Sequence, residues 1–392
     1  MASTSRLRVL LVSIVDPGER RGGAWTVTRG LVELLRRAPW NAEPAIVAAQ
    51  APRWPTLRRI VCLAAAPWTG VPAKVRYLRT DWFRDRVRAA LAGGPYDLVV
   101  INGSDLLGCL ADLRPGIRAL AIVHNREARL FRDQVDATLP WAGPLRTWLK
   151  RDGERLERYE HEWLARAGAA LFLSQDEADE FAGELPDLET LVLPPVFVDP
   201  PTRVVKAANG GLDVGFLADF AWWPNRDAAR WFVREVLGRV GGDVRLHLFG
   251  NRSRDVVRPH RRVVTHGFVD DLADVWSSCD GMIVPVRYGA GVSVKVAESL
   301  YHGMPVASTG RGLRGLPRAG HPQVVRCDSA EEWIAFLSGE RARTWCADRL
   351  PIEASRPFDL DANASRFNAF LAGVLRSTWG QSRNTGEPEF RL

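Results

Sequence analysis

GMIVPVRYGAGVSVKVAESLYHGMPVAST, residues 281–309, is the stretch that decides the fold. Residues 282–286 form a short apolar run typical of a buried strand, and residues 288–291 form a glycine loop. Ser293 is a candidate N-cap for a helix over residues 294–301, and a second strand follows that helix. The stretch therefore predicts a strand, a loop, a helix and another strand.

The start of this predicted helix suits an anion. A glycine loop that feeds a helix N-terminus offers unpaired N–H groups and the positive end of the helix dipole, which together suit phosphate. Lys295 lies in the first turn, where a cation opposes the dipole unless an anion is held there. Glu298 follows three residues later and is placed to accept hydrogen bonds from a sugar diol. These positions predict a nucleotide-sugar site.

The rest of the chain alternates strands and helices on both sides of a Pro- and Gly-rich segment at 194–211. Strands are expected at 8–15, 45–49, 96–102, 118–123, 169–174, 190–193, 213–217, 244–249, 263–264, 282–286, 305–309 and just after 323. Helices are expected at 26–37, 154–167, 225–240, 272–278, 294–301 and 361–375, with further helices within 52–90, from 175 and before 338. This alternation predicts an α/β fold of two doubly wound domains, with ligands outside the carboxyl ends of the strands in the cleft between the halves.

The domain boundaries follow from the same pattern. We predict a Rossmann-like acceptor-binding domain, a linker, a Rossmann-like nucleotide-sugar-binding domain, a helix that crosses back to the first domain, and a disordered tail. Their respective ranges are 1–195, 196–211, 212–355, 356–378 and 379–392.

Composition limits the class of protein further. The 392 residues carry a net charge of +7, which allows anionic ligands, an acidic membrane surface or nucleic acid and selects none of them. The five cysteines are scattered without a CxxC pattern, as expected for reduced cytoplasmic thiols. We expect no signal peptide, because the apolar run at 7–15 is interrupted by Arg8 and ends at Asp16. No run approaches the roughly 18 apolar residues of a membrane span.

One basic segment suggests a membrane surface. Residues 53–88 carry nine basic side chains against two acidic ones, with Trp54, Trp68, Tyr77 and Trp82 interleaved. Such a segment could lie on an anionic membrane, which would favour a lipid-linked partner. The alternative is a solvated and partly packed face. We therefore expect a cytoplasmic protein with a candidate peripheral contact to the inner face of the membrane.

Several segments, taken in order, are similar to one known family. They are GFLADFAWWPNRDAARWF (215–232), LHLFG (246–250), 265–309 and RGLRGL (311–316), with looser matches at 8–15, at Gly22-Gly23 and at IVHNREARL (122–130). The second half resembles the donor domain of GT-B glycosyltransferases, of the retaining kind grouped as family 4 (glycosyl transferases group 1). The resemblance implies a bacterial enzyme of class EC 2.4 that moves a hexosyl or related group from a UDP or GDP sugar to a hydroxyl acceptor.

The resemblance also implies roles for residues in the second half. In the family, a glutamate on this helix holds the ribose hydroxyls of the nucleotide, and Glu298 matches it. The helix N-terminus before it binds the diphosphate, which here means Gly291, Val292 and Ser293, with Lys295 adding charge. The base is bound in the family where Phe268 and its neighbours lie in this chain.

In the first half, the resemblance implies that Gly22 and Gly23 approach the diphosphate. A histidine after a strand contacts the transferred sugar near the reacting carbon, and His124 matches it as the candidate catalytic residue. Asp16 and Asp105 both follow strands in this half and are weaker candidates for acceptor contacts, as is Glu127. The acceptor class stays open among a glycan, a lipid-linked molecule and a small natural product.

Two positions depart from the family pattern. Many members place a sugar-binding glutamate eight residues before the ribose glutamate, where this chain has Ala290. Many also grip the diphosphate with Arg and Lys after the first strand of this domain, where this chain has WWPNR. Asn225 lies in that motif, and Arg226, Arg287 or Lys295 are the candidate substitutes for the missing cations.

We expect no metal and no cofactor. A divalent ion could neutralise the leaving phosphate, and enzymes that use one carry Asp-x-Asp. The only such pattern is Asp359-Leu360-Asp361, which we interpret as the cap of the last helix. Since no carboxylate is placed as a covalent nucleophile, retention suggests front-face attack, with the leaving phosphate taking the acceptor proton.

Each site residue has a structural alternative. Gly22-Gly23 can form only a tight turn, His124 can be a core histidine, Trp222-Trp223 can be packing residues, and Asn225 can be a helix cap. Glu127 can simply pair with Arg129. Two other functions also stay open: a sugar-nucleotide 2-epimerase of the same architecture, and a basic nucleic-acid binder. The epimerase needs more acid and base groups than this sequence offers, and no nucleic-acid-binding motif is present.

Overall fold

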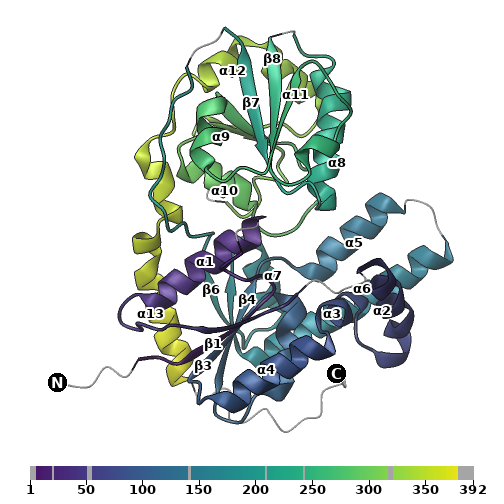
Figure 1. The fold of residues 1–392 in the computed structure, drawn as a ribbon, viewed down its shortest axis with the longest axis vertical. Helices are drawn as coiled ribbons and strands as arrows, with labels where there is room; N and C mark the ends of the chain where they lie inside the picture. Colours follow the sequence, from purple (N-terminus) through teal and green to yellow (C-terminus); the bar gives the residue numbers. More distant parts are fainter. Residues whose placement is uncertain are drawn as a thin grey trace. The chain divides into compact units, whose positions relative to one another are not determined.

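The computed structural model describes residues 6–19, 22–50, 55–139, 143–207, 210–241, 243–316 and 321–377. The chain forms two units, one of Met1–Val196 with Asn363–Leu392 and the other of Phe197–Ala362. In each unit, helices cover both faces of a parallel sheet (Figure 1).

Unit 1 contains a six-stranded sheet in the order β2-β1-β3-β4-β5-β6. Its strands are β1 Val9–Ser13, β2 Ala45–Ala48, β3 Leu98–Asn102, β4 Arg118–Val123, β5 Ala169–Phe172 and β6 Glu189–Val192. Its helices are α1 Gly22–Arg36, α2 Pro55–Thr69, α3 Ala73–Leu78, α4 Asp81–Gly93, η1 Ser104–Asp112, α5 Glu127–Thr138, α6 Pro144–Ala167, α7 Gln175–Glu184 and most of α13 Leu360–Arg376. Every residue of β1 and β3 is buried, as expected for parallel strands covered on both faces.

Unit 2 repeats this architecture in the order β12-β11-β10-β7-β8-β9. Its strands are β7 Leu212–Leu217, β8 Val244–Phe249, β9 Val263–Gly267, β10 Gly281–Val284, β11 Val306–Ser308 and β12 Val324–Arg326. Its helices are α8 Trp223–Trp231, the π-helical segment η2 Phe232–Leu237, η3 Ser253–Asp255, α9 Leu272–Ser278, α10 Val294–Tyr301, α11 Ala330–Ser338, α12 Glu340–Trp345 and η4 Ile352–Phe358. Large aromatic side chains such as Phe216, Trp276 and Trp333 fill its core.

The predicted α/β class with two Rossmann-like domains is confirmed. The bounds of α10, α9, β4 and β8 agree with the predicted ones. The deviations have local causes. The helix predicted from residue 154 begins at Pro144, which is well suited to the first helical position. The helix predicted over 225–240 becomes π-helical at Phe232.

Other helices were predicted without bounds or were not predicted. The segment predicted as irregular and then helical forms α2, α3 and α4, while Arg53 and Trp54 lie outside the described residues. The elements η1, α5 and α12 were not predicted, and η1 is a 3-10 helix, which does not follow the 3.6-residue period of an α-helix.

The boundary between the units falls between Val196 and Phe197. Residues of the predicted linker pack on unit 2. Phe197 stacks on Tyr301 with a centroid distance of 4.8 Å, and Lys206 forms ion pairs with Asp213 and Asp280. The predicted tail at 379–392 lies outside the described residues.

The last helix starts as predicted from the Asp-x-Asp pattern. The backbone N–H of Ala362 donates to Asp359 Oδ1 at 2.9 Å, so this carboxylate caps α13. From Asn363 onward the helix belongs to unit 1, where Asn368 accepts a hydrogen bond from the Trp40 indole at 2.8 Å. In the described part of the chain, no helix combines the length and the apolar character that a membrane crossing requires.

Candidate functional site at the switch points of the two sheets

Both sheets reverse their strand order at one point, and most of the predicted site residues follow the strands that flank it. The reversal lies between β1 and β3 in unit 1, and between β7 and β10 in unit 2. Ligands of open α/β sheets bind outside the carboxyl ends of the strands at such a switch point. The loops after β7 and β10 lead into α8 and α10, so both helices start at the switch point of unit 2.

The start of α10 has the features of an anion site. Ser293 occupies the N-cap position, as predicted, and its carbonyl accepts from the N–H of Val296 at 3.0 Å. Its side chain makes no capping hydrogen bond, and Ser293 Oγ is buried without a partner. The N–H groups of the first turn therefore lack the side-chain acceptor that an N-cap serine usually supplies. Gly291 has a φ of +70°, which favours glycine in the loop before the helix.

Lys295 brings a positive charge to the same turn. Its Nζ lies 5.9 Å from the centroid of the Trp222 ring, and the side chain is half-buried. Burial lowers the pKa of Lys295 to about 8, although Glu298 on the next turn opposes this shift. An ammonium group held in a partly dry position gains more from a bound anion than an exposed one does. Val292, in contrast, is buried, so only its backbone can serve a ligand.

The guanidinium of Arg287 is already paired with a carboxylate of α8. Its guanidinium pairs with both carboxylate oxygens of Asp227, at 2.8 and 2.9 Å from Nη2, and lies over the Tyr288 ring. Tyr288 in turn packs on Trp223 at a centroid distance of 4.9 Å. These contacts join the glycine loop to the start of α8, so Arg287 positions the loop.

Asn225 does not cap α8, because Trp222 occupies the N-cap position. Asn225 Nδ2 donates to the carbonyl of Asp219 at 2.9 Å, which holds the loop after β7. Its Oδ1 is buried without a hydrogen-bond partner, so one acceptor at this switch point is unused. Arg226, the next residue, is half-buried on the same turn.

The predicted base position lies after β9, at the edge of the sheet. Gly267 has a φ of +83°, and its carbonyl accepts from Gly250 N at 2.6 Å. This turn leaves the Phe268 side chain 54% exposed. An exposed aromatic face at the carboxyl end of the sheet that carries α10 can stack on a planar base.

In unit 1, His124 follows β4 and is held by a buried polar network. Its Nε2 lies 2.6 Å from Asn102 Oδ1, at the end of β3. Asn102 Nδ2 donates to Thr28 Oγ1 at 2.7 Å and to Ser13 Oγ at 3.0 Å. The Thr28 hydroxyl donates its own hydrogen to the carbonyl of Ala24 at 2.7 Å, so its oxygen must accept from Asn102.

This network determines the tautomer of His124. Because Asn102 presents its oxygen to the ring, Nε2 must carry the hydrogen. Burial lowers the pKa of His124 to about 4, so the imidazole is neutral near pH 7 and Nδ1 is an acceptor. Asn102 was missed in the sequence, although a polar residue at the end of a fully buried strand is a usable signal.

Asp105 and Glu127 share one lysine. Lys74 Nζ lies 2.9 Å from Asp105 Oδ2 and also pairs with Glu127 Oε2. The proposed pairing of Glu127 with Arg129 is not observed, since Arg129 pairs with Glu180 at 2.7 Å. Asp105 Oδ1 is buried and has no hydrogen-bond partner. Burial raises the pKa of Asp105, although Lys74 opposes this shift.

Glu160 of α6 supports this cluster and was also missed in the sequence. Its two oxygens accept from the N–H groups of Glu127 and Ala128, each at 2.9 Å, and so cap α5. Burial raises the pKa of Glu160 to about 8, against the effect of these hydrogen bonds. No local pattern marks a cap that comes from another helix.

The loop after β1 has mainly local contacts. Asp16 is exposed, and its Oδ1 accepts from Gly18 N at 2.8 Å to form a turn. The Trp25 indole donates to the carbonyl of Pro17 at 2.8 Å. Gly22 begins α1 with a φ of +63°, and a Cβ built there would meet no atom within 4 Å. Gly22 and Gly23 thus open the helix, and the space beside Gly22 is free of described atoms.

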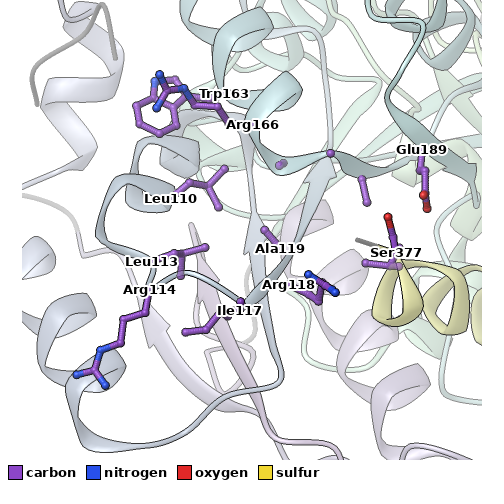
Figure 2. Close-up of a pocket in the computed structure, with 15 residues that line it drawn as sticks. Leu110, Leu113, Arg114, Ile117, Arg118, Ala119, Trp163, Arg166, Glu189 and Ser377 are labelled. Carbon is purple, nitrogen blue, oxygen red and sulfur yellow. The ribbon is translucent and has the colours of Figure 1, made fainter. Parts of the chain in front are cut away.

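A pocket elsewhere in unit 1 is not part of this site. It lies at the amino ends of β4, β5 and β6, beside Arg118, Ala169 and Glu189, and Figure 2 shows Arg166 over Trp163 at its edge. Its volume of about 70 Å³ is far below the roughly 300 Å³ at which ligand pockets begin. It is also at the opposite edge of the sheet from His124.

Comparison with known proteins agrees with this architecture. Residues 211–338 match the family model of glycosyl transferases group 1. None of the curated proteins compared with the chain matches it in sequence.

Solved structures of the same fold extend over nearly the whole chain. HepE from Anabaena, in complex with UDP and glucose, is 14% identical, with a TM-score of 0.63 over 94% of this chain and 100% of HepE. Sucrose-phosphate synthase from Thermosynechococcus elongatus is 16% identical, with a TM-score of 0.62 over 94% and 99% of the chains. The lipopolysaccharide outer core galactosyltransferase WaaB is 11% identical, with a TM-score of 0.54 over 94% and 99%.

Two parallel Rossmann-like sheets with these structural relatives define the class of GT-B proteins. The family match assigns residues 211–338, most of unit 2, to the glycosyl transferases group 1. The predicted enzyme class is thereby confirmed.

Proposed function

We propose that the chain is a retaining, metal-independent glycosyltransferase of family 4, which moves a sugar from a nucleotide diphosphate sugar to a hydroxyl acceptor. The observation that carries this proposal is the start of α10. There, an N-cap serine caps nothing, a lysine is held half-buried, and the turn lies at the switch point of a parallel sheet. The acceptor would be a glycan, a lipid-linked molecule or a small natural product.

The diphosphate would bind at the first turn of α10. Its oxygens would accept from the N–H groups of Ser293 and Val294 and from Lys295 Nζ. As the bond between the anomeric carbon and the phosphate oxygen breaks, negative charge builds up on that oxygen. Each preorganised donor at such a position stabilises the transition state by about 3 kcal/mol.

The nucleoside would extend from this turn along the carboxyl edge of the sheet. Glu298 would accept hydrogen bonds from the ribose hydroxyls, and Phe268 would stack on the base. Because HepE is in complex with UDP and glucose, UDP is the first nucleotide to test. Asn225 Oδ1 is a buried acceptor available for a donor hydroxyl, which offers one route to sugar recognition without a glutamate at position 290.

His124 would accept a hydrogen bond from a hydroxyl of the transferred sugar through Nδ1. A neutral ring suits this task, because an imidazolium would place a positive charge next to an anomeric carbon that itself becomes positive. The acceptor oxygen would attack on the face that the phosphate leaves. The acceptor proton would pass to the leaving phosphate oxygen, so the stereochemistry is retained without a covalent intermediate.

The decisive experiment is a thermal-shift series with UDP, GDP, TDP and their sugar conjugates. At least one nucleoside diphosphate should raise the melting temperature, and Glu298→Ala should remove that shift while the chain stays folded. EDTA should change neither the shift nor the transfer rate. If no nucleoside diphosphate stabilises the chain, the proposal fails. A rate that EDTA abolishes and Mg²⁺ restores would contradict metal independence.

We further propose that the protein works in the cytoplasm, at the inner face of a membrane. The support is the basic and aromatic composition of residues 53–88. Contact with a membrane would bring unit 1 to a lipid-linked acceptor.

A further inference from the structure

The helix α2 turns an apolar stripe toward solvent. Along its length, apolar residues recur at helical spacing and are all exposed: Leu57, Ile60, Val61, Ala64 and Trp68. The side chain of Trp68 is 80% exposed, whereas Cys62 and Ala66 on the other side of the helix are buried. A helix on the surface of a soluble domain normally directs its apolar stripe to the core. This inversion points to a partner outside the chain.

The beginning of α6 extends this stripe. Leu145 and Trp148 are also exposed there, and the Trp148 indole donates to the carbonyl of Leu63 at 3.2 Å. This bond joins α6 to α2, and the two helices lie side by side at the edge of unit 1 (Figure 1). We use the term α2–α6 face for the exposed apolar side chains of both helices. They are Leu57, Ile60, Val61, Trp68, Leu145 and Trp148.

The charge around the α2–α6 face has one sign. The segments 55–69 and 144–151 contain five basic side chains and no acidic one: Arg58, Arg59, Arg146, Lys150 and Arg151. Asp136 pairs with Arg146 at 2.6 Å and lies 3.5 Å from Lys150, so one carboxylate offsets part of this charge. The surroundings stay positive, which complements an anionic surface.

Several basic side chains of the broader segment 53–88 are paired within the protein and are not available to such a surface. Lys74 is paired with Asp105 and Glu127. Arg88 pairs with Asp112 at 2.9 Å, and Arg86 covers the Trp82 ring at 4.9 Å. The composition of the segment therefore overstates its accessible charge. The apolar stripe of α2, together with α6, is the part that faces outward.

We propose that the α2–α6 face docks on the surface of an anionic lipid bilayer. Trp68, Ile60 and Trp148 would enter the headgroup region, where tryptophan favours the boundary between apolar and wet layers. The exposed Arg59, Lys150 and Arg151 would contact lipid phosphates, whereas Arg58 donates to the carbonyls of Arg76 and Tyr77. A second copy of the chain fits less well, because it would bring two positive faces together. The inference rests on the membrane contact in the proposed function and not on the transfer chemistry.

The test is co-sedimentation of the full chain with vesicles. Phosphatidylcholine alone should not retain the protein, whereas a mixture with an equal part of phosphatidylglycerol should, and added salt should weaken that binding. Ile60→Asp and Trp68→Ala should each lower the partition coefficient about tenfold or more. Ile352→Asp is the matched control, because Ile352 is also an exposed isoleucine but belongs to unit 2. It should bind as the parent chain does.

Other outcomes would overturn the inference. Equal binding of Ile60→Asp and the parent chain would mean that another surface meets the lipid. A concentration-dependent dimer that forms without vesicles and is lost in Ile60→Asp would assign the face to a second copy. UDP-induced thermal shifts measured on the same variants separate the two proposals. If vesicle binding fails while UDP still stabilises the chain, only the docking face is wrong.

Discussion

The two switch points differ in how far their polar groups are already satisfied. In unit 1, His124 is held by Asn102, and Lys74 joins Asp105 to Glu127, although Asp105 Oδ1 is buried without a partner. In unit 2, Ser293 Oγ and Asn225 Oδ1 are buried without partners. A buried polar atom without a partner costs about 1–3 kcal/mol, which a ligand can recover. Unit 1 is thus largely preorganised, while unit 2 has the unused groups expected of the diphosphate grip.

The largest effect should come from breaking the satisfied cluster of unit 1. Lys74→Met leaves two buried carboxylates without their cation, and losing one partner of a buried ion pair costs about 3–5 kcal/mol. Urea denaturation should show this loss in the free energy of unfolding. Lys150→Met is the matched control, since Lys150 is exposed, and should change stability by less than about 1 kcal/mol. Equal stability of the two variants would show that the cluster is not an energetic unit.

The next effect should appear at the start of α10 in unit 2, in catalysis and not in folding. Lys295→Met should lower kcat/KM by about 10²–10³-fold, because one preorganised cation at the leaving phosphate is lost. Lys295→Arg should recover part of the rate, since it keeps the charge. Melting temperatures without nucleotide should stay close to that of the parent chain. A variant that loses stability but keeps its rate would reverse the assignment of roles between the units.

A smaller effect is expected when the hydrogen-bond network around His124 is altered but not removed. Asn102→Asp places a carboxylate beside His124 Nε2 and should raise the pKa of His124 from about 4 by roughly 1–3 units. NMR titration of the ring would measure that shift. kcat/KM should then fall toward acidic pH, where Nδ1 becomes protonated and stops accepting. An unchanged pKa would mean that Asn102 does not determine the protonation of His124.

The smallest effect is a pH dependence of nucleotide affinity. The diphosphate binds the protonated form of Lys295, whose pKa in the free protein is about 8. A bound anion raises that pKa, so affinity should be constant below about pH 8 and fall by at most about tenfold per pH unit above it. Lys295→Arg should move the break to higher pH. Titration calorimetry of UDP at several pH values would measure both, and a flat profile through pH 10 would contradict the role of Lys295.

The sequence was most informative where structure is local. Helix α10 agrees with its predicted bounds at both ends, because glycine, the N-cap and apolar periodicity act within a few residues. The parallel strands were also predictable, since burial on both faces leaves continuous apolar runs. The prediction of Asp359 as a helix cap rests on the same short-range chemistry, and the structure has that hydrogen bond.

Contacts between distant segments could not be predicted in this way. Lys74 looked like one cation of a basic surface, but folding brings it to Asp105 and Glu127, which follow it by 31 and 53 positions in the printed sequence. The sequence left residues 53–88 open between a membrane surface and a partly packed face, and only the packed domain shows which apolar residues of α2 face outward.

The sequence by itself thus determined the two α/β domains and the phosphate-suited turn at α10, because backbone conformation and apolar patterning are encoded over short distances. The tertiary structure decided which polar groups are satisfied, because a charge or an amide finds its partner on other strands and helices. Those partners set the tautomer of His124, engage Arg287 with Asp227, and leave Ser293 and Asn225 with unused atoms.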